Sequence, residues 1–269
     1  MAYRIPRWLS RRATLTGAVA LGLSIAAHAQ SERDWGALAV EDTTPPILPP
    51  DLQSYSDQPS LNGPVTDYQP FGTHPPTTEE QELARKVLSK VPTNCTPMDV
   101  ALYFLDVGAG KFGPELRPYI TAWPLDWNPV IVDFFKTTDT QPSGDTTSWC
   151  AAFVNFCLVK AAIGKTLPPG SEEPTRSAAS STFRYWSHQV KPPTDTVRPG
   201  DLVVFRNKQS PGYGHVGFFL AENEARILVL GGNQFEGTPV RHTINRKWIA
   251  KDGPVLQFHS YRSDPQLHA

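Results

Sequence analysis

The chain has 269 residues, of which 39% are hydrophobic and 19% are charged, a balance that is ordinary for a soluble protein. Its 27 prolines are the unusual component. The formal net charge is −1, and it becomes −5 without the first 29 residues, because four arginines and no acids lie there. An acidic chain lacks the basic surface that follows nucleic-acid phosphates, so we expect no nucleic-acid partner.

Residues 1–29 have the pattern of an export signal. An apolar run from Leu15 to Ala27 is followed by Ala27-His28-Ala29, which has the form of a cleavage site. The alternative is a membrane anchor, although this run is too short to span a bilayer comfortably. We therefore expect export to the periplasm or the extracellular space, with no stable membrane span once the signal is removed. The basic residues before the apolar run, which leave the Sec and twin-arginine routes both open, are Arg4, Arg7, Arg11 and Arg12.

Residues 30–77 are predicted to form a proline-rich tether. Nine prolines fall between Pro45 and Pro76, among serine, threonine, aspartate and glutamine. Such a composition favours extended conformations and cannot form a packed core. The alternative is a strap that packs along the domain through its larger apolar side chains, which are Leu48, Tyr55, Tyr68 and Phe71.

Residues 78–263 are predicted to form one domain, with a helical extension before a core at residues 129–261. Residues 77–80 have the spacing of a capping box, and apolar residues then repeat at helical spacing. Thr96 and Pro97 start a second helix that we expect to end at Gly108. The stretch 112–128 is expected to be irregular, and residues 129–136 to form a short buried helix.

After Gly200 the pattern changes to alternating or continuous apolar runs, which are typical of strands separated by turns. Helices come first in the chain and strands follow, so the predicted fold class is α+β, with an antiparallel sheet packed against the helix that begins at Cys150. The predicted strands are Asp201–Phe205, His215–Leu220, Arg226–Leu230, Val240–Ile244 and Val255–Tyr261.

Cys150 stands at the start of a predicted amphipathic helix, with capping residues at 146–148. A thiol at a helix N-terminus is close to the positive end of the helix dipole, which favours the nucleophilic thiolate. The alternative is an inert core cysteine, which is how we interpret Cys157 in the middle of the same helix. These two cysteines are roughly 10 Å apart along the helix, beyond disulfide reach, and the state of Cys95 is left open. The predicted apolar stripe is Cys150, Phe153, Val154, Cys157, Leu158 and Ala161.

His215 opens an apolar strand and is the candidate base for Cys150. A cysteine nucleophile needs an adjacent base and a group that orients this base. Gly217, on the same face of the strand as His215, is expected to leave room for the cysteine helix. A hairpin would return Asn233 alongside His215, where its amide could accept the imidazole N–H, and the backbone N–H of Cys150 is a candidate oxyanion donor. The alternatives are a satisfied core histidine and an asparagine that only serves a Gly-Gly-Asn turn.

Four segments in order resemble the CHAP family, the cysteine, histidine-dependent amidohydrolases/peptidases of the papain-like superfamily, many of which cut peptidoglycan. The resemblance covers residues 129–261 and implies a papain-like fold, with Cys150 as nucleophile and His215 as base. Many members carry Glu-x-Asn after the histidine; here Gly231 stands at the acid position and Asn233 carries over. The segments are Trp149-Cys150-Ala151-Ala152-Phe153-Val154-Asn155, Arg198-Pro199-Gly200-Asp201-Leu202-Val203-Val204-Phe205, Gly214-His215-Val216-Gly217-Phe218 and Leu230-Gly231-Gly232-Asn233-Gln234.

The expected function is therefore that of an exported cysteine amidase or endopeptidase acting on peptidoglycan peptides. Two alternatives stay open: an inactive wall-binding module, which the missing acid supports, and a cysteine amidase or transferase with another substrate. We expect no cofactor and no metal, because the spacings typical of zinc ligands do not occur. The other residues considered are Asp201 as a turn acid, His188, His242 and His259 as surface or strand polar groups, and Trp149 and Trp186 as groove or core aromatics.

Overall fold

The computed structural model of the chain describes residues 74–142, 144–145, 147–236 and 241–269. Every described residue belongs to one compact unit. The predicted export signal and residues 30–73 of the predicted tether lie outside the described residues. Within the described residues, no helix has the length and apolarity needed to cross a membrane.

The first two described helices begin where the sequence predicts. Thr77 and Glu80 form a capping box before α3 (Thr78–Leu88), and Thr96 and Asp99 form another before α4 (Pro97–Gly108). In each box the hydroxyl and the acid satisfy backbone N–H groups reciprocally, which fixes the start of the helix. The capping prediction is therefore confirmed at both positions.

The stretch after α4 is more ordered than the sequence suggests. Pro114–Ile120 forms a 3₁₀ helix, η3, inside the segment predicted to be irregular. Pro114 suits the first position of such a helix, because its missing N–H would have no partner there. The short buried helix is confirmed as α5 (Pro129–Phe134), which is continued by the 3₁₀ turn η4 (Phe135–Thr137).

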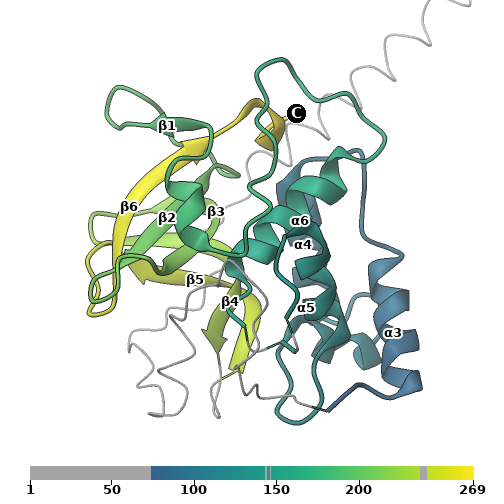
Figure 1. Cartoon of the computed structure of the whole chain (residues 1–269). Coiled ribbons are helices and arrows are strands. Elements are labelled where there is room, and N and C mark those ends of the chain that lie inside the picture. The colour runs from purple at the N-terminus through teal and green to yellow at the C-terminus, as the bar shows by residue number, and fades with distance from the viewer. Residues whose placement is uncertain (1–73, 143, 146, 237–240) are drawn as a thin grey trace, which may run out of the picture. The chain divides into compact units, whose positions relative to one another are not determined.

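One antiparallel sheet of six strands, in the order β1-β6-β2-β3-β4-β5, completes the α+β architecture (Figure 1). Five strands lie at the predicted places. β1 was not predicted, because three residues are too few to show a period of two. The strands are β1 (His188–Val190), β2 (Leu202–Asn207), β3 (Gly214–Glu222), β4 (Arg226–Glu236), β5 (Arg241–Ala250) and β6 (Leu256–Ser263).

Helix α6 (Cys150–Ala162) is central to this unit. It contacts α4 and α5 as well as β3 and β4. All of its residues from Cys150 to Leu158 are buried, so the prediction of a single apolar stripe was too narrow. A helix that is covered on every side is apolar all round, which is why its sequence shows little contrast between faces.

An aromatic cluster joins the N-terminal helices to α6. The ring of Phe104 on α4 lies 5.3 Å from that of Phe134, 5.8 Å from that of Phe153 and 5.9 Å from that of Phe156, measured between centroids. All four side chains are at most 1% exposed. Aromatic pairs at this spacing contribute packing energy beyond the area that they bury. The helical extension is therefore part of the hydrophobic core.

Candidate active site

Cys150 is the first residue of α6 and is 3% exposed. The residue at the N-cap is Trp149 rather than one of the predicted residues 146–148, and its own side chain makes no capping hydrogen bond. Helix N-termini present N–H groups that have no partner within the helix, together with the positive end of the dipole. The nucleophile candidate is thus the first residue of its helix, at the positive end of the helix dipole.

His215 is the second residue of β3 and is 6% exposed. It is paired across the sheet with Phe205 of β2, and the two ring centroids are 6.4 Å apart. Burial lowers the pKa of His215 to about 4, because a charged imidazolium loses its hydration there. Near neutral pH the imidazole is therefore uncharged and able to accept a proton.

Two consecutive glycines of β4 lie next to the imidazole of His215 and to the residue before Cys150, respectively. A Cβ atom at Gly231 would lie 3.3 Å from Nε2 of His215. A Cβ atom at Gly232 would lie 2.4 Å from the ring of Trp149, the residue directly before Cys150. The absence of side chains at these two positions lets the N-terminus of α6 and the ring of His215 approach neighbouring residues of one strand.

The role predicted for Gly217 is wrong. The space beside Gly217 is filled by Cγ1 of Val229 and the carbonyl oxygen of Leu230, which would lie 2.5 and 2.8 Å from a Cβ atom there. The glycine that admits the cysteine helix is Gly232. The sequence shows that small residues are present but not which strand the helix crosses.

Asn233 lies in a bulge of β4, where the pairing with β5 shifts register between Gly231 and Gln234. Its φ of 59° is in the left-handed region, which asparagine tolerates better than most residues. The chain continues as a strand here, so the predicted Gly-Gly-Asn turn does not form. A single extra residue in one strand bends it locally and re-aims the side chains that follow.

The amide of Asn233 is bonded to a different histidine from the one predicted. Its Oδ1 lies 2.5 Å from Nδ1 of His242, whose ring packs edge-on against Phe235 at 4.6 Å. His242 was interpreted as a surface or strand polar group; it is on β5, and burial lowers its pKa to about 4. The structure therefore places Asn233 on His242, and the neighbour of the His215 ring is Gln234.

Gln234 is the residue that sequence reasoning missed. Its Cδ atom would lie 3.4 Å from a Cβ atom at Gly231, so its amide fills the space left beside that glycine. A glycine in place of an expected acid leaves room for another side chain, and this was the available signal.

Asp201 serves its turn as predicted: one oxygen accepts the N–H of Arg198 at 2.7 Å and the other lies 2.8 Å from Nε2 of His268.

Residues 142–233 match the family model of the CHAP domain. The chain contains a CHAP domain. Its matched segment includes Cys150 and His215 and ends at Asn233, and CHAP domains are in general hydrolases of the amidase and peptidase type. No curated protein and no solved structure matched the chain. In the part of the chain that the structure describes, no three histidine, cysteine, aspartate or glutamate side chains are grouped so as to hold a metal ion.

All three cysteines of the chain carry thiols rather than disulfides. Within the CHAP domain, Cys157 is fully buried, and burial raises the pKa of its thiol well above the usual value. Burial also raises the pKa of Cys95, and the charge of Asp99 adds to this. A protonated thiol is a poor nucleophile, so neither of these two cysteines has the environment of a reactive one.

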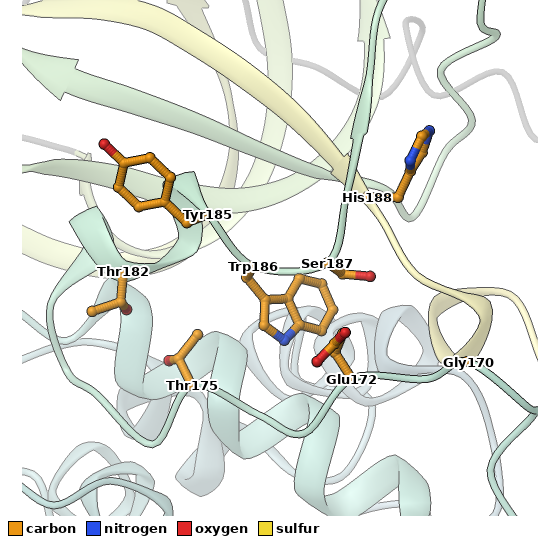
Figure 2. A pocket seen from close by; sticks show the side chains of 8 residues that line it. All are labelled: Gly170, Glu172, Thr175, Thr182, Tyr185, Trp186, Ser187 and His188. Carbon is orange, nitrogen blue, oxygen red and sulfur yellow. The ribbon is translucent and has the colours of Figure 1, made fainter.

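A pocket of about 530 Å³ lies along the segment that leads into β1 (Figure 2). Trp186 lies at its centre and donates its indole N–H to the carbonyl of Glu173 at 2.9 Å, while the ring of Tyr185 is 83% exposed. The guanidinium of the preceding residue, Arg184, donates to the carbonyls of residues 211 and 213, just before His215. Trp149, the other aromatic considered for a groove, is fully buried and lines none. The pocket is lined by Gly170, Glu172, Thr175, Thr182, Tyr185, Trp186, Ser187 and His188.

Acid is expected to destabilise the folded unit that contains His215 and His242 between about pH 6.5 and about pH 4. In this window His215 and His242 stay neutral in the folded state, while in the unfolded chain they bind protons at the ordinary pKa of 6.5. The unfolded state therefore holds more protons, and the free energy of unfolding falls as the pH falls, by up to roughly 3 kcal/mol for each histidine. Urea unfolding at pH 7.0, 5.5 and 4.5 measures this loss.

The variant His242→Gln isolates this contribution from that of Asp145. Burial raises the pKa of Asp145 to about 7, so its protonation favours the folded state as the pH falls from about 7 to about 4 and opposes the histidines. The variant keeps Asp145 and removes one histidine, so it should lose less stability between pH 7.0 and pH 4.5 than the wild type. The control is His188→Gln, because the His188 side chain is 71% exposed. An identical loss in His242→Gln and the wild type would contradict the prediction.

Proposed function

We propose that this protein is an exported cysteine hydrolase that cleaves amide bonds in peptidoglycan, as an amidase or an endopeptidase. The observation that carries the proposal is the CHAP-domain match, which includes Cys150 at the start of α6 and His215 on β3, the residues with the roles of nucleophile and base. The export signal predicted for residues 1–29 would bring the protein to the compartment that holds this substrate.

In the proposed mechanism the neutral imidazole of His215 takes the proton of the Cys150 thiol as the sulfur attacks the carbonyl carbon of the amide. The tetrahedral intermediate carries a negative charge on its oxygen, and the N–H groups of the first turn of α6 are suited to bind it. His215 then gives its proton to the leaving amine, and a thioester remains on Cys150. Water, deprotonated by His215, hydrolyses the thioester and restores the thiol.

The lowered pKa of His215 favours a thiol and a neutral imidazole at rest over a preformed thiolate–imidazolium pair. Proton transfer then accompanies the attack on the substrate. This arrangement resembles that of papain-like hydrolases, with a nucleophile at a helix N-terminus and a base on a facing strand. The pocket lined by residues between Gly170 and His188 is a candidate surface for wall chains, with Tyr185 as its most exposed aromatic side chain.

The test is digestion of purified peptidoglycan by the mature protein, with the released fragments identified by mass spectrometry. We expect fragments with new amino groups: an amidase separates whole stem peptides from the glycan, whereas an endopeptidase cuts within or between the peptides. His215→Ala should lower the rate of release by at least about 100-fold, the usual contribution of a general base. Binding to the wall without any release would instead support an inactive binding module, and products that carry an added acceptor would support a transferase.

A further inference from the structure

We propose that Gln234 is the positioning residue for His215 and that it acts from the space that Gly231 leaves open. The inference rests on the proposed function, in which Cys150 and His215 are the reacting groups. It concerns the position where many CHAP proteins carry an acid and this chain carries a glycine. In this chain the amide of Gln234, three residues further along β4, takes the orienting role that the acid has in those proteins.

Gln234 and His215 lie on the two sides of the space beside Gly231. A Cβ atom at Gly231 would lie 3.3 Å from Nε2 of His215 and 3.4 Å from both Cδ and Nε2 of Gln234. The Gln234 side chain is 3% exposed and that of His215 is 6% exposed. The carboxamide and the imidazole therefore flank a single volume from which water is excluded, and this volume is where a side chain at position 231 would lie.

The hydrogen bonds of the Gln234 amide fix its orientation. Nε2 of Gln234 is surrounded by acceptors: the carbonyl oxygens of Asn245, Gly231 and Val229 at 2.8, 3.2 and 3.4 Å, and Oδ1 of Asn245 at 3.0 Å. Rotating the amide by half a turn would set Oε1 against these oxygens, so its orientation is fixed. Oε1 therefore points away from the carbonyls of β4 and β5.

The side chains of Gln234 and His215 each carry a buried polar atom without a hydrogen-bond partner among the described residues. Oε1 of Gln234 and Nε2 of His215 are both buried, and neither has a hydrogen bond within the part of the chain that the structure describes. The two atoms do not meet the geometry of a hydrogen bond. Burial lowers the pKa of His215 and the Lys247 charge adds to this, whereas the Gln234 side chain acts in the opposite direction and raises it. Catalytic hydrogen bonds are often long in the absence of substrate and tighten in the complex. Because Oε1 can only accept, the bond requires the proton to be on Nε2 of His215.

The consequence is a fixed tautomer. With Nε2 protonated, Nδ1 carries the lone pair and is the nitrogen that accepts the proton of the Cys150 thiol. A group that holds the base in its reactive tautomer is the third member of the generalised triad. The bulge of β4 makes this possible, because residues 231 and 234 would face opposite sides of an unbulged strand.

The tautomer is tested directly by ¹⁵N NMR of the histidine side chains in the wild-type protein near pH 7. We expect the chemical shifts of His215 to show a protonated Nε2 and an unprotonated Nδ1. The opposite tautomer, or an even mixture, overturns the proposal without any variant. The measurement does not depend on activity, so failure of the proposed function, which is read from fragment release, is distinguishable from failure of this inference.

A side-chain exchange tests the role in catalysis. Gln234→Met keeps the length of the side chain without its acceptor, and should lower kcat on peptidoglycan by roughly 100-fold and leave His215 in a mixture of tautomers. In the double variant Gln234→Ala, Gly231→Glu, the new carboxylate at position 231 supplies an acceptor in the same volume. This double variant should be at least about 10-fold faster than Gln234→Ala alone. The control is Gln257→Met on β6, whose amide contacts the exposed Arg206. A Gln234→Met protein with the wild-type rate and an unchanged tautomer would overturn the proposal.

Discussion

Replacing Cys150 with alanine is expected to lower the rate of peptidoglycan digestion by about 1,000-fold or more, whereas Cys157→Ala should keep it within about threefold of the wild type. Both cysteines lie on α6, but Cys150 is at the end that carries the unsatisfied N–H groups and Cys157 is in the middle, fully buried. Removing the nucleophile eliminates the covalent route, whereas removing a core thiol takes away only packing. Comparing Cys150→Ala with Cys157→Ala thus distinguishes the loss of a reacting group from the loss of packing within one helix.

Two measurements follow this prediction. Initial rates of fragment release give the activities, and thermal unfolding identifies any loss caused by destabilisation. Alkylation of the wild type with iodoacetamide, followed by peptide mass spectrometry, should label Cys150 before Cys157, whose thiol has a pKa well above the usual value. Equal activity of Cys150→Ala and the wild type, or earlier labelling of Cys157, would refute the assignment of the nucleophile.

Gly232→Ala is expected to destabilise the folded state by about 1–3 kcal/mol and to lower the activity together with the stability. The added methyl group would lie 2.4 Å from the ring of Trp149 and 3.0 Å from Cβ of Phe153. The Trp149 ring cannot move aside easily, because it is fully buried and packs against Phe134 at 6.0 Å. Relief therefore requires the start of α6 to shift, and Cys150 shifts with it.

The matched control is Gly212→Ala, because a Cβ atom at that glycine would meet nothing within 4 Å. Thermal unfolding should show a melting temperature lowered by roughly 2–12 °C for Gly232→Ala and nearly unchanged for Gly212→Ala. The activity should be measured well below the lower melting temperature, so that any loss reports the displaced helix start. If both variants melt together and digest peptidoglycan equally fast, the contact between β4 and α6 is not as tight as described.

The sequence predicted those parts of the fold that depend on local signals. The capping boxes at Thr77 and Thr96 place the starts of two helices because a hydroxyl and an acid three residues apart satisfy each other's N–H groups. Five of the strands were visible as apolar runs bounded by turn residues. Cys150 and His215 were predicted as nucleophile and base from their residue types and from the pattern around them, and both lie within the residues that match the CHAP domain; their roles stay predictions.

The parts that were missed depend on contacts between distant segments. The bulge at Asn233 is set by how β4 pairs with β5, and no local pattern separates it from a turn of the same sequence. Its extra residue moves Asn233 onto His242 and brings Gln234 beside His215, so the proposed role of Gln234 could not be found by counting positions in a motif. The cover on every side of α6 was also missed, because it comes from separate segments before and after the helix, namely α4, α5, β3 and β4.

The aromatic cluster around Phe104 determines where this protein can be divided. Residues 142–233, which match the family, contain Cys150 and His215 but not Gln234, α4 or strands β5 and β6. A fragment limited to them would lose the ring that packs on Phe153 and Phe156, leaving a void behind the nucleophile helix, and would expose β4 as an unpaired edge. The autonomous folding unit is therefore longer than the family segment, and its boundaries follow the packing of the core.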